Sequence, residues 1–157
     1  MIIWCLLIAI AFVSTPQWSE AAEKEDVLED LKCFIMPKRG VKGKKVMDYK
    51  GAKLYLCCSS CVKRMTKTPE KYEAKANHQL LQTGQFVQNA CPTSGDAISD
   101  ASPVLEIGGV KVKFSSEQHK DVVAQLELEV QLEKVFGAKG FKMGKFVLKV
   151  DPKAATP

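Results

Sequence analysis

The sequence lacks the residue patterns on which most enzyme active sites are built. No arrangement of Ser, His and Asp, no phosphate-binding glycine loop and no pair of carboxylates stands out in its 157 residues. Histidine occurs only twice, as His78 and His119. We therefore expect that this protein is not an enzyme.

A long apolar run is also missing. Residues 1–13 are almost wholly apolar, but about 12 apolar residues are too few to cross a hydrocarbon core of roughly 30 Å. Residues 14–22 then bring Pro16, polar residues and the small-x-small run Ser19-Glu20-Ala21, which is typical of a cleavage site. We predict that residues 1–22 are a secretory signal peptide and that the mature chain, without a membrane span, is periplasmic or extracellular. Because no Lys or Arg precedes the apolar run, an uncleaved anchor is the alternative.

Aromatic residues are few, at 8%, and none interrupts the basic segment 38–45, which includes Arg39. Basic residues without interleaved aromatics argue against a nucleic-acid partner and favour a solvated loop. The net charge of +5 is concentrated between residues 32 and 67. This half can attract an acidic protein partner or an anionic lipid surface at low salt. Hydrophobic residues at 46% and charged residues at 26% are typical of a folded globular chain.

Cysteine is the residue that occurs in an unusual pattern. Loss of the signal peptide removes Cys5 and leaves five cysteines, an odd number: Cys33, Cys57, Cys58, Cys61 and Cys91. Three of them fall within five residues, at the expected junction of a strand and a helix. Backbone N–H groups at such a junction favour thiolate over thiol, and Cys33 can close the site from a neighbouring loop. The pattern therefore predicts a metal site of Cys33, Cys57 and Cys61, with Cys58 as the further thiolate.

Zinc and copper are both candidates for this site. Zinc prefers four ligands in tetrahedral geometry, whereas copper(I) is satisfied by a few soft thiolates. Two alternatives stay open, because exported proteins favour disulfides. Cys33 can pair with Cys57 or Cys61 as a structural staple of an interaction domain, and Cys58-Ser59-Ser60-Cys61 has the CxxC spacing of a thiol redox site.

The chain also aligns with itself at one offset, of 58 residues. The offset places Cys33 on Cys91, Val46-Met47-Asp48 on Val104-Leu105-Glu106, Gly51 on Gly109, and Cys61 on His119. Cys57 and Cys58 fall on Ser115 and Ser116, which are poor ligands for soft ions. We infer a duplication whose second copy, residues 89–150, has lost the thiols of the first copy, residues 23–88. Residues 151–157 are expected to form a flexible tail.

Local patterns predict an α+β fold in which each copy is a β-hairpin followed by a helix. The first copy has strands at 45–49 and 53–56, and the second has strands at 104–107 and 110–114, each pair joined by a glycine turn. Ser59 or Ser60 is expected to cap a short helix through Met65, and Thr68-Pro69-Glu70 to start another, with Tyr72, Ala76 and Leu80 buried. Ser116 is expected to cap one helix over 117–136, with Val122, Val123, Leu126, Val130 and Leu132 as its apolar positions, and a last strand over 141–150.

The order of these residues resembles the YHS and TRASH group of cysteine-rich modules, which are associated with heavy-metal sensing and trafficking. The family motif is a lone Cys, a gap of about twenty residues, Cys-x-x-x-Cys after an aromatic strand, and then a Pro and a Tyr. The matching residues here are Cys33, Leu54-Tyr55-Leu56-Cys57, Cys61 and Pro69-Glu70-Lys71-Tyr72. Tandem members are similar from about Cys33 to Phe146, including Ala76-Asn77-His78-Gln79-Leu80 and Cys91-Pro92.

The resemblance implies a ββα, treble-clef-like module that binds a metal through Cys57 and Cys61, with no known reaction. The second copy departs from the family pattern at Ser115 and His119, so its metal chemistry is not carried over. His78 is a weaker candidate for a fourth ligand, because a helical His beside Asn and Gln is more often a surface or capping residue. Met36, Met47 and Met65 are interpreted as core residues rather than as thioether ligands.

Overall fold

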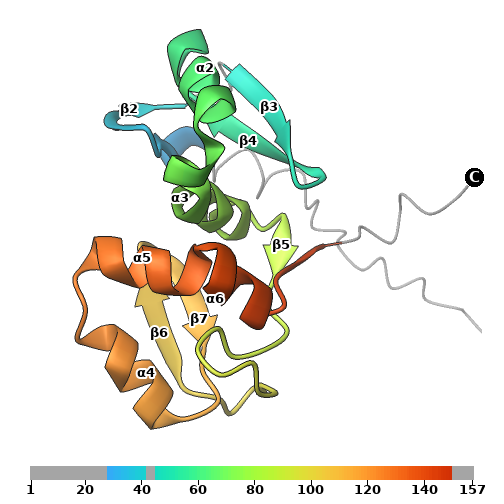
Figure 1. The fold of residues 1–157 in the computed structure, drawn as a ribbon, viewed down its shortest axis with the longest axis vertical. Coiled ribbons are helices and arrows are strands. Elements are labelled where there is room, and N and C mark those ends of the chain that lie inside the picture. Colours follow the sequence, from blue (N-terminus) through green and yellow to red (C-terminus); the bar gives the residue numbers. More distant parts are fainter. Residues whose placement is uncertain (1–27, 42–44, 150–157) are drawn as a thin grey trace, which may run out of the picture.

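The computed structural model describes residues 28–41 and 45–149, which form a mixed α+β fold, as predicted (Figure 1). The predicted signal peptide, the C-terminal tail and residues 42–44 of the basic segment lie outside the described residues. Within the described ranges, no helix is both long enough and apolar enough to pass through a membrane.

The first half contains two antiparallel strand pairs. β1 (Lys32–Cys33) pairs with β2 (Met36–Gly40), and β3 (Lys45–Tyr49) pairs with β4 (Ala52–Leu56). The sequence did not predict the β1–β2 pair, but it predicted the β3–β4 hairpin. Both residues of its turn, Lys50 and Gly51, have positive φ angles, of 50° and 79°. This conformation matches the twist of a two-residue hairpin, so β4 starts at Ala52, one residue earlier than expected.

Two helices follow this hairpin, α2 (Ser59–Lys67) and α3 (Pro69–Gln82). Capping of α2 by Ser59 or Ser60 was wrong, since Cys58 occupies the N-cap position and makes no side-chain cap. Pro69 opens α3 as expected, whereas the Thr68 hydroxyl donates to the Arg64 carbonyl instead of capping α3. Of the three expected buried positions, Ala76 and Leu80 are fully buried and Tyr72 is partly buried.

The second half has the predicted hairpin, β6 (Val104–Ile107) and β7 (Val110–Lys113), followed by helices. The single helix expected over 117–136 was wrong: α4 (Glu117–Ala124) and α5 (Leu128–Phe136) are separate. The chain can break between them because the Gln131 side chain donates to the Leu126 carbonyl, 2.9 Å away. Val122 and Val130 are about half exposed, at 54% and 50%, so they do not lie on the buried face that was predicted.

The last strand expected over 141–150 is present but much shorter than predicted. Residues 138–143 form α6 (Ala138–Met143), and only β8 (Val147–Leu148) is extended, paired with β5 (Phe86–Val87). Gly140 permits this helix to pack tightly, because a Cβ there would lie 2.1 Å from the Lys134 carbonyl oxygen. Phe141 is therefore buried against Phe86 and Phe146.

The two halves share one hydrophobic core. Its largest buried side chains come from both hairpins and from α3 and α5, and they include Leu54, Leu80, Ile107, Phe114 and Phe136. Figure 1 shows α3 lying between the β3–β4 hairpin and α5. A second, smaller cluster surrounds the cysteines and contains Leu31, Cys33, Val41, Leu56 and Cys61. This cysteine cluster is separate from the main core, but partly buried side chains such as Phe34 and Met47 pack against both.

Three consecutive polar residues of α3 join the parts of the molecule. Asn77 donates to the Phe136 carbonyl at 2.7 Å, and the ring nitrogen Nε2 of His78 lies 3.0 Å from the Ile107 carbonyl. Gln79 makes a pair of hydrogen bonds with the backbone of Tyr55, of 2.8 Å and 3.0 Å. Each residue satisfies backbone groups that would otherwise be buried without partners.

Candidate metal centre

Three cysteines from separate elements meet in the first half. Cys33 ends β1, Cys57 follows β4, and Cys61 lies in the first turn of α2. Their Sγ atoms all lie within 4.8 Å of one another, and those of Cys57 and Cys61 are 3.7 Å apart. Cys33 and Cys61 are 0% and 1% exposed, whereas Cys57 is partly exposed. This group of cysteines could hold a metal ion.

The backbone explains why these side chains converge. The β1–β2 register shifts between Lys32 and Cys33, and a turn at Phe34 and Ile35 pairs Cys33 with Met36. At the other end of the site, the Cys58 carbonyl accepts the N–H groups of Cys61 and Val62, at 3.1 Å and 3.3 Å. This tight turn places the side chains of Cys57, just before α2, and of Cys61, inside α2, next to each other. The predicted junction of a strand and a helix at the cysteines is therefore present.

The surroundings of the four thiols favour different protonation states. Burial opposes ionisation of Cys33, but backbone N–H groups of Cys57, Met36 and Ile35 directed at its sulfur lower its pKa. Burial raises the pKa of both Cys57 and Cys61. Hydrogen bonds from the backbone and side chain of Cys61 lower the pKa of Cys58 to about 7. The thiolate form is therefore favoured at Cys33 and Cys58, and the thiol form at Cys57 and Cys61.

Cys58 occupies a different position from the other three cysteines. Its Sγ lies 3.6 Å from that of Cys61, but it is not part of the group whose sulfurs are all within 4.8 Å of one another. Its side chain is partly exposed. Whether Cys58 binds an ion therefore stays a prediction, as does the role of each of the other three.

The other candidate ligands, His78 and three methionines, either point away from the cysteines or pack in the hydrophobic clusters. His78 is directed toward the second half, where its ring contacts Phe136 edge-on at 5.1 Å between centroids and its Nε2 faces the Ile107 carbonyl. Burial lowers its pKa, so its ring stays neutral. Met65 is 1% exposed in the main core, and Met36 and Met47 pack against the cysteine cluster, as expected for core filling.

A second group of polar side chains lies in the other half. Ser115 Oγ is 2.8 Å from His119 Nδ1, and Cys91 Sγ is 4.0 Å from the same nitrogen. Burial opposes ionisation of Cys91, but hydroxyl groups of Ser115, Ser94 and Thr93 lower its pKa to about 6. The 58-residue offset pointed to Cys91, Ser115 and His119, but no sequence signal identified Thr93 and Ser94 as their partners.

No protein-family model, curated protein or solved structure matches this chain. The function therefore has to be argued from the chemistry of the site.

Proposed function

We propose that this protein binds one soft metal ion through the thiolates of Cys33, Cys57 and Cys61. The observation that supports it is the convergence of three sulfur atoms within 4.8 Å, two of them shielded from solvent. Three thiolates around one ion, with metal–sulfur bonds of about 2.3 Å, lie about 4.0 Å apart in a trigonal plane. The distance of 3.7 Å between Cys57 and Cys61 is close to this value.

The donor set favours copper(I) over zinc. Copper(I) accepts few soft ligands, whereas a structural zinc site needs four. Only three sulfurs belong to the compact group, and His78 is held in the other half. A zinc site would need the sulfur of Cys58 to move toward the other three.

The family and the duplication are part of the same proposal. β4 and β7 start 58 residues apart, and so do α2 and α4. Gln79 pairs with both backbone groups of Tyr55, and Gln88 pairs with both backbone groups of Lys113, the residue that the same offset aligns with Tyr55. These correspondences support two treble-clef-like YHS/TRASH modules, of which the second has lost its ligands.

We further propose that the protein is exported and not an enzyme, and that it sequesters, carries or senses its ion. The predicted signal peptide supports export. Among the residues that the structure describes, the titratable neighbours of the buried thiols Cys33 and Cys61 are other cysteines, which supports ion binding rather than catalysis on an organic substrate.

Native mass spectrometry with elemental analysis tests the proposal on full-length protein kept reduced and loaded with copper(I) or zinc. We expect one copper ion per chain, lost in Cys33→Ser and in Cys61→Ser. Cys91→Ser is the matched control, because it removes a buried thiol of the second half, and it should keep the ion. Absence of copper from the unmodified chain, or equal loss in all three variants, would contradict the proposal.

A disulfide is the second candidate, because the Cys61 sulfur lies 3.7 Å from that of Cys57 and 3.6 Å from that of Cys58. These distances permit closure into a staple or a redox pair after small side-chain rotations. Thiol counting on protein purified without reductant separates the two. Six reactive thiols in the full-length chain, or five once Cys5 is lost with the signal peptide, favour the metal site. A stable Cys61 disulfide with no metal uptake after reduction favours the staple.

A further inference from the structure

One of the four clustered cysteines is positioned differently from the rest. The sulfurs of Cys33 and Cys61 are shielded from solvent, and Cys57 and Cys58 are both partly exposed. Cys58 alone of the four lies outside the group whose sulfurs are all within 4.8 Å of one another, and its sulfur contacts that of Cys61 at 3.6 Å. We infer that Cys58 is the exchange thiol of the site, the thiol through which the ion enters. This inference rests on the proposed function. Cys58 takes the soft ion from an anionic thiolate carrier in solution and passes it to Cys61.

The fold leaves the Cys58 sulfur available for this role. Cys58 is the N-cap residue of α2, with extended backbone angles of −163° and 164°. Its carbonyl oxygen holds the first turn of the helix by accepting from Cys61 and Val62, and its side chain makes no cap. The two hydrogen bonds to the Cys58 carbonyl oxygen can therefore maintain the helix start when the sulfur changes partners.

The transfer balances as a ligand exchange without oxidation. The carried ion forms a bond to the Cys58 sulfur and loses one bond to a carrier thiolate, which takes the proton of Cys58. The ion then forms a bond to the Cys61 sulfur and leaves Cys58, which takes the proton of Cys61. The ion next forms a bond to the Cys57 sulfur and leaves the last carrier thiolate, which takes the proton of Cys57, and the Cys33 thiolate completes the set of three ligands. The net change moves the ion inward and two protons outward, with no change of oxidation state.

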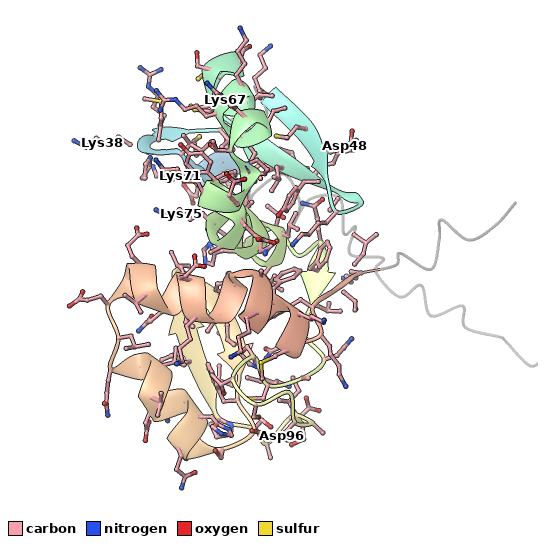
Figure 2. All side chains as sticks on the ribbon, in the orientation of Figure 1. Lys38, Asp48, Lys67, Lys71, Lys75 and Asp96 are labelled. Carbon is pink, nitrogen blue, oxygen red and sulfur yellow. The ribbon has the colours of Figure 1, made fainter. Side chains whose placement is uncertain are left out.

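The charge around the site favours a carrier of negative charge. Six cationic side chains on β2, α2 and α3 are exposed and form no ion pair with another described residue: Lys38, Arg39, Lys63, Arg64, Lys67 and Lys71. Figure 2 shows Lys38, Lys71 and Lys75 along one side of the first half, with Asp48 on the opposite side. No acidic residue lies in the first turn of α2. Such a surface raises the local concentration of an anionic complex.

Stopped-flow spectroscopy under anaerobic conditions tests the inference, with copper(I) offered in excess glutathione, an acidic thiol. Cys58→Ser is expected to slow uptake about tenfold, because direct attack on buried sulfurs is hindered. The variant should still bind one ion at equilibrium. Ser59→Ala, the exposed neighbour at the start of α2, is the matched control and should take up copper as fast as the unmodified chain.

Two outcomes would overturn the role of Cys58. Uptake by Cys58→Ser at the unmodified rate would show that exchange does not need this thiol, and loss of the ion, as in Cys61→Ser, would make it a resting ligand. Both outcomes leave copper binding by the unmodified chain intact, whereas failure of that chain to bind would refute the proposed function itself. Equal uptake at low salt from glutathione and from the neutral thiol 2-mercaptoethanol would refute the preference for an anionic carrier.

Discussion

The side-chain amide of Asn77 donates a hydrogen bond of 2.7 Å to the carbonyl oxygen of Phe136, 59 residues further along the chain. The other atom of the same amide, Oδ1, accepts from Lys50 Nζ at 3.0 Å. Asn77 is 0% exposed, so the contact with Phe136 is made away from water, whereas the contact with the exposed Lys50 is only partly buried. One side chain on α3 therefore links the turn of the first hairpin to the end of α5.

We expect Asn77→Ala to destabilise the protein by about 1–3 kcal/mol, because the Phe136 carbonyl would remain buried without a donor. Thermal denaturation in the metal-free state measures this change. Gln82→Ala, at an exposed position near the end of the same helix, should leave the melting temperature almost unchanged. Equal melting temperatures for the two variants would show that the Asn77 contacts do not hold the halves together.

Metal binding and folding should be coupled in the first half. The cysteine cluster has a small core of five buried residues, so a bound ion would contribute much of its local stability. Cys61→Ser is expected to lower the melting temperature strongly when copper(I) is present and much less when the ion is absent. Calorimetry of both proteins in both states measures the difference. The same loss with and without metal would mean that Cys61 acts only through packing.

The second half is predicted to bind no ion. His119 Nδ1 already forms a hydrogen bond with Ser115 Oγ. Neutral hydroxyls are also poor ligands for soft ions. The double variant Cys91→Ala, His119→Ala should therefore still bind one ion per chain, as counted by native mass spectrometry. Two ions in the unmodified chain, with one lost in the double variant, would show a working second site.

Affinity for the ion should rise with pH. Burial raises the pKa of Cys57 and Cys61, so both sulfurs carry protons near neutral pH that a metal ion must displace. The raised pKa favours the thiol, and each increase in pH reduces the competition from protons. Competition titrations with a chelator of known affinity, between about pH 6 and about pH 8, measure the slope. An affinity that does not change with pH would indicate thiols that are already ionised, or oxidised.

Much of the candidate site could be read from local sequence. Gly51 and Gly109 mark hairpin turns, and the alternation of apolar residues around them placed β3, β6 and the starts of the helices that follow within one or two residues. The short spacing of Cys57 and Cys61 required that their side chains meet at the start of α2. These features depend on contacts between near neighbours, so periodicity and turn residues contain the necessary information.

Longer-range features could not be read in this way. The pattern over 117–136 is compatible with a single helix, but burial of Val135 and Phe136 beside α3 selects two helices with a break between them. Phe141 has a high strand propensity and yet lies in α6, because aromatic packing with Phe86 and Phe146 outweighs local preference. The sequence does not show which side chains pack against residues 117–136 or against Phe141, so it could not show that this packing outweighs the local preference.

The sequence by itself determined the candidate ligands: three cysteines at a strand–helix junction and one more that precedes them. Only the tertiary structure decided how they divide, with Cys33 brought close to Cys57 and Cys61 in one compact group and Cys58 outside that group. The physical reason is that spacing specifies which side chains can meet along a turn. Burial and the closing of a site by a distant segment depend on how the hairpins and helices pack against one another.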